Sequence, residues 1–441
     1  MLLKFEVSNL LSFDERVSLS MVPSLNSKKD TIKLKNSSVL QFSAIYGANA
    51  SGKSNIISAL NIMKRFVMQG IKTLDSNSYC KNNSLNKSKL TEFNIVYYIN
   101  GRYYNYGFSI IISKGIIQEE WLLSIDPKND TQKVLMNYTR GNKNVDNVFP
   151  ENEFQTETKD RLKTYLYDLS DNKDVLLMSD LVRKKIKSKD LIFVKNFKEW
   201  FSLLDINFAE GPIDFYEYMD DGNFDRVERI LNEFNTGISK VYFENVTLDE
   251  LIKKTDKNMV DELLKEIEET IKKQGKLRGI IRGGKELYRI MADSIDEIKV
   301  WTIKLNHNNS SSVFDFSEES DGTRRLFDLL DIVLTAKQNA IYVIDELERS
   351  LHPVLVKRLL EILREEFSKR QIQLIFTTHE THIMDLKLLR KDEIWFVEKN
   401  EQGASHLYSL DIFKVRNDKI IENGYLNGIY GGIPLFKKMV D

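Results

Sequence analysis

The sequence predicts an α/β fold in which short buried strands end in polar residues. Three short apolar runs support this prediction, because each has the length of a buried strand: VLQFSAIY (39–46), IYVI (341–344) and QLIF (373–376). The first run is followed by small residues and then by SNIISALNIMKRF, in which apolar side chains recur at helical spacing. A strand, a glycine-rich turn and a helix in this order are typical of a phosphate-binding unit.

The composition is that of a globular protein without covalent cross-links. The chain has 441 residues, of which 42% are hydrophobic and 29% charged, and a formal net charge of −1, which gives no overall attraction to nucleic acid or acidic membranes. The single cysteine, Cys80, excludes an internal disulfide framework and suits a reducing compartment. No run approaches the roughly 18 apolar residues of a membrane span, and MLLKFEVSNL alternates like a strand rather than a signal peptide. These features predict a soluble, cytoplasmic protein.

The turn after the first strand fits the pattern G-x-x-x-x-G-K-[ST] at every fixed position, since it reads GANASGKS from Gly47 to Ser54. In such a loop, backbone N–H groups and the positive end of the following helix face the phosphates. The lysine reaches the β- and γ-phosphates, and the hydroxyl holds Mg²⁺. We therefore expect Lys53 and Ser54 to bind a nucleotide with Mg²⁺. The alternative is a plain strand–turn–helix corner.

The other two strands end in groups that a nucleotide hydrolase needs. Hydrolysis requires a carboxylate for Mg²⁺ and a second group that activates water. Asp345 directly follows IYVI, and Glu346 comes next. His379 follows QLIFTT, where an imidazole could contact a γ-phosphate. The alternatives are a strand that merely ends in acidic residues and a histidine with a structural role.

A second candidate anion site precedes an amphipathic helix within 317–334. The segment SEESDGTRRLFDLLDIVL places Ser320, Gly322 and Thr323 ahead of leucines at helical spacing. Hydroxyl and glycine residues at a helix N-terminus can bind anions. Because the first loop already contacts its own nucleotide, we expect this second site to serve a nucleotide held by another copy of the chain. The alternative is an ordinary N-cap.

Taken in order, these elements resemble the core of ABC-type ATPases, with GANASGKS as Walker A, SDGT as signature loop, IYVIDE as Walker B and TTH as switch histidine. The Walker A motif and the signature loop are far apart in the sequence, and in this respect the chain resembles the RecF/SMC-like branch of these ATPases. The phrases FEVSNLLSFDE, EESDGTRRLFDLL, IDELERSLHP, DEIWFVEKN and YLNGIYGGIP look most similar to stand-alone AAA-family ATPases of prokaryotic phage defence. These include the ATPase half of OLD nucleases, RloA and the ATPase subunit of the PARIS abortive-infection system. The implied fold is a two-lobed ABC-type P-loop ATPase core with a helical insertion between the lobes.

The resemblance implies a role for each matched residue. Contacts with ATP are implied for ten residues, of which the last three reach the nucleotide of a second subunit: Gly47, Asn49, Ser51, Gly52, Lys53, Ser54, Asn55, Ser320, Gly322 and Thr323. Mg²⁺ is implied at Ser54 and Asp345, general-base catalysis at Glu346, and contact with the γ-phosphate at His379. His352 departs from the family pattern, because many ABC proteins have an aspartate there. Gln118 is the only candidate for a Q-loop glutamine.

The chain is expected to comprise an N-terminal ATPase lobe over 1–150, a helical insertion over 151–295 and a C-terminal ATPase lobe over 296–441. The insertion has helix-like segments such as NMVDELLKEIEETIKK, but no heptad pattern persists long enough for a coiled coil. Two basic stretches, 183–189 and 272–285, could bind nucleic acid or an anionic partner. The alternative is a solvated surface whose charge is balanced by nearby acidic residues.

An alternating segment, FNIVYYINGRYYNYGFSIII (93–112), predicts a hairpin with its turn at Asn100-Gly101. Its aromatic residues are expected to pack within a sheet, and the alternative is base stacking. The aromatic cluster consists of Tyr103, Tyr104, Tyr106 and Phe108.

Motifs and resemblance together predict a homodimer or higher homo-oligomer that hydrolyses ATP at its interface and acts as sensor or scaffold in antiphage abortive infection. OLD nucleases carry a Toprim nuclease domain that needs a D-x-D metal pair, and the residues after His379 contain none. A separate effector, such as a Toprim-like or other nuclease, is therefore expected to carry out any cleavage. Two alternatives stay open: a RecF/SMC-like DNA-repair ATPase that binds DNA, and a scaffold that ATP locks without an enzymatic role.

Overall fold

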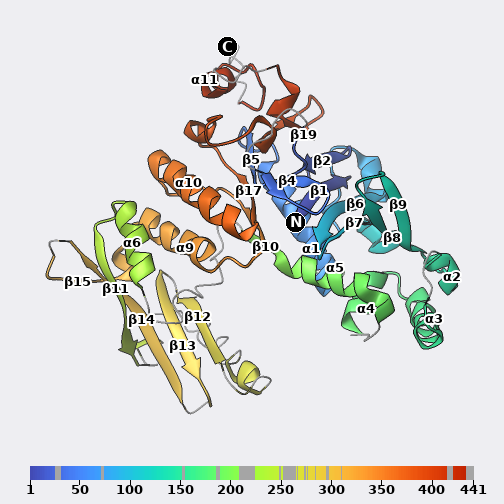
Figure 1. Cartoon of the computed structure of the whole chain (residues 1–441), viewed down its shortest axis with the longest axis horizontal. Helices are drawn as coiled ribbons and strands as arrows, with labels where there is room; N and C mark the ends of the chain where they lie inside the picture. Colours follow the sequence, from blue (N-terminus) through green and yellow to red (C-terminus); the bar gives the residue numbers. More distant parts are fainter. Residues whose placement is uncertain are drawn as a thin grey trace. The chain divides into compact units, whose positions relative to one another are not determined.

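The computed structural model of the chain, shown in Figure 1, falls into two compact units. Unit 1 comprises Met1–Phe208, Lys337–Leu347 and Arg364–Asp441, and unit 2 comprises Ala209–Ala336 and Glu348–Leu363. The residues that the structure describes are 1–24, 31–70, 74–150, 154–184, 189–207, 224–247, 250–251, 265, 267–272, 275, 277–283, 285–294, 297–308, 310–414 and 421–433. The boundaries at 150 and 295 between the two expected ATPase lobes and the insertion stay a prediction.

The central sheet of unit 1 confirms the predicted α/β character. Its strands follow the order β10 (Leu204–Asn207), β16 (Ile341–Ile344), β17 (Gln373–Thr377), β5 (Phe42–Gly47), β18 (Ile394–Lys399) and β19 (Ser405–Ser409). All neighbours are parallel except β18 and β19, which are antiparallel. Every residue of β5, β16 and β17 is buried, as expected for continuous apolar runs that are covered on both faces.

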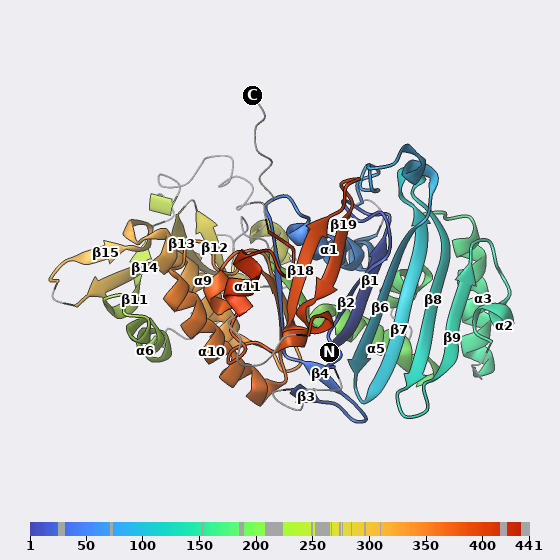
Figure 2. The ribbon, with the colours of Figure 1, turned by 90° about the horizontal axis from the view of Figure 1, so that it is seen from above.

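A second, wholly antiparallel sheet of unit 1 has the order β2 (Val17–Ser20), β1 (Leu2–Ser8), β6 (Thr91–Ile99), β7 (Arg102–Ile111), β8 (Ile116–Asp126) and β9 (Thr131–Thr139). The side-by-side arrangement of β1 and β6 to β9 is visible in Figure 2. The predicted hairpin is confirmed, because β6 pairs with β7 around Asn100 and Gly101, whose φ angles are 50° and 79°. A separate pair consists of β3 (Thr31–Lys33) and β4 (Ser38–Leu40).

Helices join the two sheets of unit 1 in one hydrophobic core. They are α1 (Lys53–Gln69), α2 (Val145–Val148), α3 (Thr156–Ser170), α4 (Leu177–Arg183) and α5 (Ile192–Leu203). A further helix of this unit, α11 (Ile421–Leu426), lies outside this core. The core includes Ile57 of α1, Phe93 of β6 and Ile45 of β5. Gln373 also links the sheets, because its side chain accepts a bond from the Leu2 N–H at 2.6 Å and donates to the Leu2 carbonyl at 3.0 Å.

The aromatic cluster of β7 is buried, with Tyr104, Tyr106 and Phe108 in this core and Tyr103 in a separate hydrophobic cluster. Tyr103, Tyr104, Tyr106 and Phe108 are all at most 3% exposed. The Tyr104 ring stacks on Tyr97 at 5.3 Å, and the Phe108 ring packs edge-on against Phe66 of α1 at 5.2 Å. The packing interpretation is therefore confirmed, and the base-stacking alternative is wrong, because these rings have no free face for a base.

Unit 2 contains an antiparallel sheet against which helical segments pack. The strand order is β11 (Ile238–Val246), β14 (Ile298–His307), β13 (Glu286–Ala292) and β12 (Leu277–Gly283), and β15 (Val313–Asp315) also pairs with β14. Helices α6 (Asp225–Glu233) and α9 (Asp321–Thr335) share a core with this sheet through Leu231, Ile303 and Phe327. Helix α10 (Pro353–Arg370) begins in unit 2 and ends in unit 1.

The segment 151–295, expected to be a helical insertion, contains α3 to α6 but is not helical throughout, because strand β10 lies between α5 and α6 and three further strands follow α6. Strands β11, β12 and β13 lie there, and β11 and β13 both pair with β14, which belongs to the segment assigned to the C-terminal lobe. The charged residues of these strands resemble the polar face of a helix in sequence, whereas cross-strand pairing decides their conformation. Of the basic stretches, residues 185–188, 273, 274, 276 and 284 lie outside the described residues, so a basic surface stays a prediction.

Among the described residues, no helix is both long enough and apolar enough to cross a membrane.

Candidate functional site

The predicted strand–turn–helix unit is present in unit 1. Strand β5 ends at Gly47, and α1 begins at Lys53 after Gly52, which has a left-handed φ of 109°. Only glycine fits at Gly47, because a Cβ there would lie 2.5 Å from the Val397 carbonyl oxygen. The loop therefore passes close to the end of β18, and α1 begins directly after it, as in the predicted strand–turn–helix unit.

Two polar side chains of the loop are buried within it. Lys53 is 6% exposed, and its ammonium donates to the carbonyl oxygens of Gly47 at 2.9 Å and Ala48 at 3.0 Å, so the side chain lies across the loop. Within the described part of the chain, the buried Ser51 hydroxyl has no hydrogen-bond partner. An orphaned buried hydroxyl beside a held ammonium fits a loop that gains partners when a phosphate binds. Asn49 is exposed at the tip of the loop.

The carboxylate at the end of β16 meets the first turn of α1. Ser54 Oγ donates to Asp345 Oδ1 at 3.0 Å, and the Thr377 hydroxyl donates to the same oxygen. This meeting follows from the parallel order β16-β17-β5, which brings the carboxyl ends of three strands to one edge. A hydroxyl and a carboxylate are hard oxygen donors of the kind that Mg²⁺ prefers. The residues present therefore fit the predicted metal.

Glu346 follows in a strained backbone conformation. Its φ is 47°, which costs a non-glycine residue about 1–3 kcal/mol unless the surroundings enforce it. Thr377 provides this support, because the Glu346 N–H donates to Thr377 Oγ1 at 2.8 Å and the Leu347 N–H donates to the Thr377 carbonyl at 3.1 Å. The strain fixes the direction in which the Glu346 side chain leaves the end of the strand.

His379 lies within electrostatic reach of the same residues. Partial burial of the imidazole and the nearby Lys53 ammonium lower its pKa, whereas the carboxylates of Glu346 and Asp345 act in the opposite direction. The lowered pKa favours the neutral imidazole at neutral pH, which can donate one hydrogen bond. Lys53, Ser54, Asp345, Glu346 and His379, predicted from three separate stretches of sequence, therefore lie in one site.

Three residues that hold the loop or the acidic residues in place were not predicted from the sequence, namely Thr377, Ser12 and Ser405. Ser405 Oγ donates to the Ser51 carbonyl and lies 2.8 Å from Ser12 Oγ, which accepts a bond from the Asn55 amide at 2.7 Å. Ser12 belongs to FEVSNLLSFDE, a phrase that carried the resemblance, whereas Ser405 gave no signal.

These serines close the loop from the side of Gly52. A Cβ on Gly52 would lie 2.5 Å from Ser405 Oγ and 2.7 Å from Ser12 Oγ. The β18–β19 hairpin places Ser405 there, since the Ser405 N–H also donates to the Ser12 carbonyl at 2.8 Å. The loop is therefore held by residues from both ends of the chain.

The second predicted anion site lies in unit 2 at the start of α9. Ser320 is the N-cap, because its Oγ accepts a bond from the Thr323 N–H at 3.1 Å and lies 2.9 Å from the Thr323 hydroxyl. The N-cap alternative is thus confirmed as the local structure, and a role toward a second copy stays a prediction. The first turn of α9 approaches the loop before α10 closely, since a Cβ on Gly322 would lie 2.7 Å from the Ser350 carbonyl oxygen.

The departures from the family pattern have local explanations or stay open. His352 caps α10, because its Nδ1 accepts a bond from the Val354 N–H at 3.3 Å and its carbonyl accepts one from Leu355 at 2.8 Å. Pro353 follows at the first helical position, where a missing N–H costs nothing. Gln118 lies in β8, and its assignment as a Q-loop residue stays a prediction.

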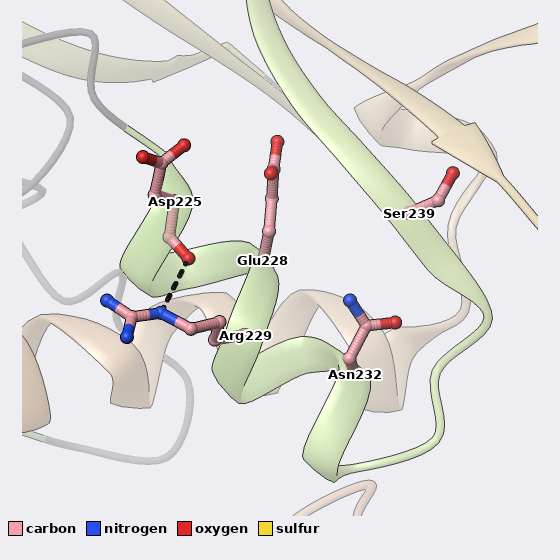
Figure 3. A pocket seen from close by; sticks show the side chains of 5 residues that line it. All are labelled: Asp225, Glu228, Arg229, Asn232 and Ser239. Atoms are coloured by element: carbon pink, nitrogen blue, oxygen red, sulfur yellow. Dashed lines mark hydrogen bonds between the residues drawn. The ribbon is translucent and has the colours of Figure 1, made fainter.

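Unit 2 also has a surface hollow of about 540 Å³, shown in Figure 3. Its lining comes from α6 and β11: Asp225, Glu228, Arg229, Asn232 and Ser239. Glu228 accepts a bond from the Val241 N–H at 2.8 Å, and Arg229 Nε donates to the Asp225 carbonyl at 3.3 Å. None of the residues predicted to contact a nucleotide lines this hollow.

Comparison with known proteins finds one family whose model matches the chain. The model of a family described as "AAA domain, putative AbiEii toxin, Type IV TA system" matches residues 42–385, which include every residue discussed above as a nucleotide contact. No sequence among curated proteins matches the chain significantly.

Solved structures show remote similarity. The head domain of an SMC protein bound to the C-winged helix domain of ScpA is 16% identical, with a TM-score of 0.41, over 92% of this chain and 97% of that chain. The SMC head domain from Thermotoga maritima is 13% identical, with a TM-score of 0.36, over 92% of this chain and 98% of that chain.

Proposed function

The chain belongs to the AAA-domain family whose model matches residues 42–385, and we propose from this premise that it is an ABC-type ATPase. The observation that carries the proposal is the junction of Ser54 and Thr377 on one oxygen of Asp345, beside Lys53 and Glu346. A plain strand–turn–helix corner needs neither a buried carboxylate nor an orphaned loop hydroxyl.

Each residue of the junction has a task in this proposal. The loop N–H groups and Lys53 would bind the β- and γ-phosphates. Ser54 and Asp345 would hold Mg²⁺, whose charge neutralises the phosphate oxygens. Glu346, fixed by its strained backbone, would accept a proton from the attacking water. The neutral His379 would donate a hydrogen bond to the γ-phosphate.

We further propose that two copies enclose two ATP molecules. Ser320, Gly322 and Thr323 lie together at the start of α9 in unit 2, whereas the loop that we propose to hold ATP lies in unit 1. Ser320 is exposed, which supports a contact with the nucleotide of another copy. Hydrolysis would remove that contact and loosen the dimer, so that the nucleotide state sets the assembly state.

The biological role proposed for this dimer is control of a separate effector, such as a nuclease, in cytoplasmic antiphage defence of the abortive-infection type. It is supported by the resemblance to ATPases of phage defence and by the family description, which names a toxin–antitoxin system. The segment 151–295 would provide the surface for the effector or for nucleic acid.

The test is the solution mass of the Glu346→Gln variant with and without Mg·ATP. Removal of the base should trap ATP, so we expect a shift to a dimer or larger assembly, while phosphate release falls at least about 100-fold. Lys53→Ala should abolish both ATP binding and the shift. Glu401→Gln, which changes an exposed carboxylate in the β18–β19 turn, is the matched control and should behave like the wild type.

Each possible result separates the alternatives. An unchanged mass in the presence of bound ATP would refute the nucleotide-sandwich dimer. Retained micromolar affinity in Lys53→Ala would refute the assignment of the loop, and normal turnover of Glu346→Gln would assign the base elsewhere. Turnover that rises strongly with DNA would favour the DNA-repair alternative, and ATP-dependent assembly without turnover in the wild type would favour the scaffold.

A further inference from the structure

The switch histidine lies between two anchored points of the chain in unit 1. On the strand side, the Thr378 N–H donates to the Ile45 carbonyl at 3.0 Å, and Thr378 Oγ1 accepts a bond from the Glu380 N–H at 2.9 Å. On the far side, a short 3₁₀-helix, η7 (Thr381–Ile383), begins two residues after His379. The position of the imidazole therefore depends on what holds Thr381.

Thr381 is held by the C-terminal part of the chain. Its hydroxyl donates to Glu422 Oε1 of α11 at 2.9 Å, and its carbonyl accepts a bond from the Met384 N–H at 2.9 Å. Glu422 is partly buried, with 25% of its side chain exposed. His382 approaches the same carboxylate at 3.9 Å, but its side chain is 67% exposed, so this ion pair contributes little.

Helix α11 is itself firmly attached, so Glu422 is a fixed partner. One turn after Glu422, the Tyr425 ring stacks on Phe396 of β18 at 5.5 Å and packs against Tyr46 at 6.0 Å. Tyr46 directly precedes Gly47, the first residue of the phosphate loop. The Tyr425 hydroxyl donates to the Gly432 carbonyl at 2.9 Å, and this bond attaches the segment after α11 to the helix.

We propose that Glu422 is a positioning residue for ATP hydrolysis, which acts through Thr381 to fix the segment that carries His379. This inference rests on the proposed function, in which His379 contacts the γ-phosphate. Helix α11 then connects the start of the phosphate loop, through Tyr46 and Tyr425, with the switch segment, through Glu422 and Thr381. Removal of the Glu422–Thr381 bond should impair the chemical step more than the binding of ATP, because Lys53 and the loop are not touched.

The experiment compares steady-state ATP hydrolysis of Glu422→Ala and Thr381→Val with the wild type. We expect kcat to fall about 10-fold in each, as for other supporting residues of a site, while KM changes less than twofold. Because both changes remove the same bond, the double variant should be no slower than either single variant. Glu422→Gln and Thr381→Ser keep an acceptor and a donor, so both should restore kcat.

A matched control lies directly after the same helix. Asn427 donates to the Asn423 carbonyl at 2.7 Å on the exposed side, so Asn427→Ala should leave kcat unchanged. A Glu422→Ala variant with normal kcat would overturn the proposal, and so would a double variant whose losses multiply. A Glu422→Gln variant as slow as Glu422→Ala would overturn the hydrogen-bond mechanism.

A second measurement does not depend on turnover. The chain has five histidines, and the ring signal of His379 in a carbon–proton NMR spectrum can be assigned by its loss in His379→Gln. Glu422→Ala and Thr381→Val should move this signal in the free protein, and Asn427→Ala should not. An unmoved His379 signal refutes the positioning role even if the wild type hydrolyses ATP, whereas a moved signal in a protein without turnover refutes the proposed function alone.

Discussion

The hydroxyl of Thr377 is the point at which the proposed active site can be tested most sharply. It donates to the Asp345 carboxylate and accepts a bond from the Glu346 N–H at 2.8 Å, so one atom orients both acidic residues. Thr377→Val keeps the shape of the side chain and its β-branch but removes the hydroxyl. Thr377→Ser keeps the hydroxyl and removes the methyl group, which makes it the matched control.

The size of the effect follows from the two bonds. A hydrogen bond to a charged group contributes about 1.5–3 kcal/mol, and an orphaned backbone N–H costs about 1–3 kcal/mol. Because both bonds share one hydroxyl and Glu346 is only partly buried, the two contributions do not add fully. We expect Thr377→Val to lower the free energy of unfolding by about 2–4 kcal/mol. Loss of this support should lower kcat about 10- to 100-fold, as is found for other residues that orient ligands of a metal.

The measurements are phosphate release at saturating Mg·ATP and urea-induced unfolding of the three proteins. Thr377→Ser should stay within about threefold of the wild-type kcat, since it retains both bonds. A Thr377→Val variant with wild-type kcat and stability would refute the idea that this hydroxyl organises Asp345 and Glu346. If Thr377→Ser were as impaired as Thr377→Val, the lost methyl packing would be the cause instead.

Three further predictions follow from other positions. Burial raises the pKa of Glu120 to about 7, so its contribution to stability is fully present below the unfolded pKa near 4.5 and is lost as the pH rises through 7. The difference in unfolding free energy between the wild type and Glu120→Gln should therefore change by about 2–3 kcal/mol between pH 5 and pH 8, and a constant difference would contradict this. Gly52→Ala should weaken ATP binding, measured by calorimetry, at least about 10-fold, because Gly52 has a left-handed φ and a Cβ there would meet Ser405. The control is Gly70→Ala, which should bind ATP normally, because Gly70 also has a left-handed φ but a Cβ there would meet open space. Gly322→Ala should lower the unfolding free energy by about 1–3 kcal/mol and weaken Mg·ATP-dependent association, and unchanged association by mass would show that this close approach is dispensable.

The parts of the site that could be predicted from the sequence are those whose functional residues are neighbours in the chain. The loop from Gly47 to Ser54 can be recognised in the sequence, because a phosphate loop needs a tight turn, a lysine and a hydroxyl residue at fixed spacing. Asp345 and Glu346 could be predicted because they follow four apolar residues, at the end of a strand where a nucleotide hydrolase needs a metal-binding carboxylate and a base. The strands of unit 2 were misjudged because β11 and β13 are defined by β14, a partner remote in sequence.

By itself, the sequence determined the α/β class and predicted a phosphate loop and an acidic pair, since each depends on local spacing and apolar patterning. Only the tertiary structure decided which side chains hold these residues in place. Thr377 reaches Asp345 through the parallel pairing of β16 and β17, and Ser405 reaches the loop from the β18–β19 hairpin. Glu422 reaches the switch segment from the last described helix. Such contacts join residues far apart in the chain, and no local pattern records them, because they exist only after the sheet has fixed the register of its strands.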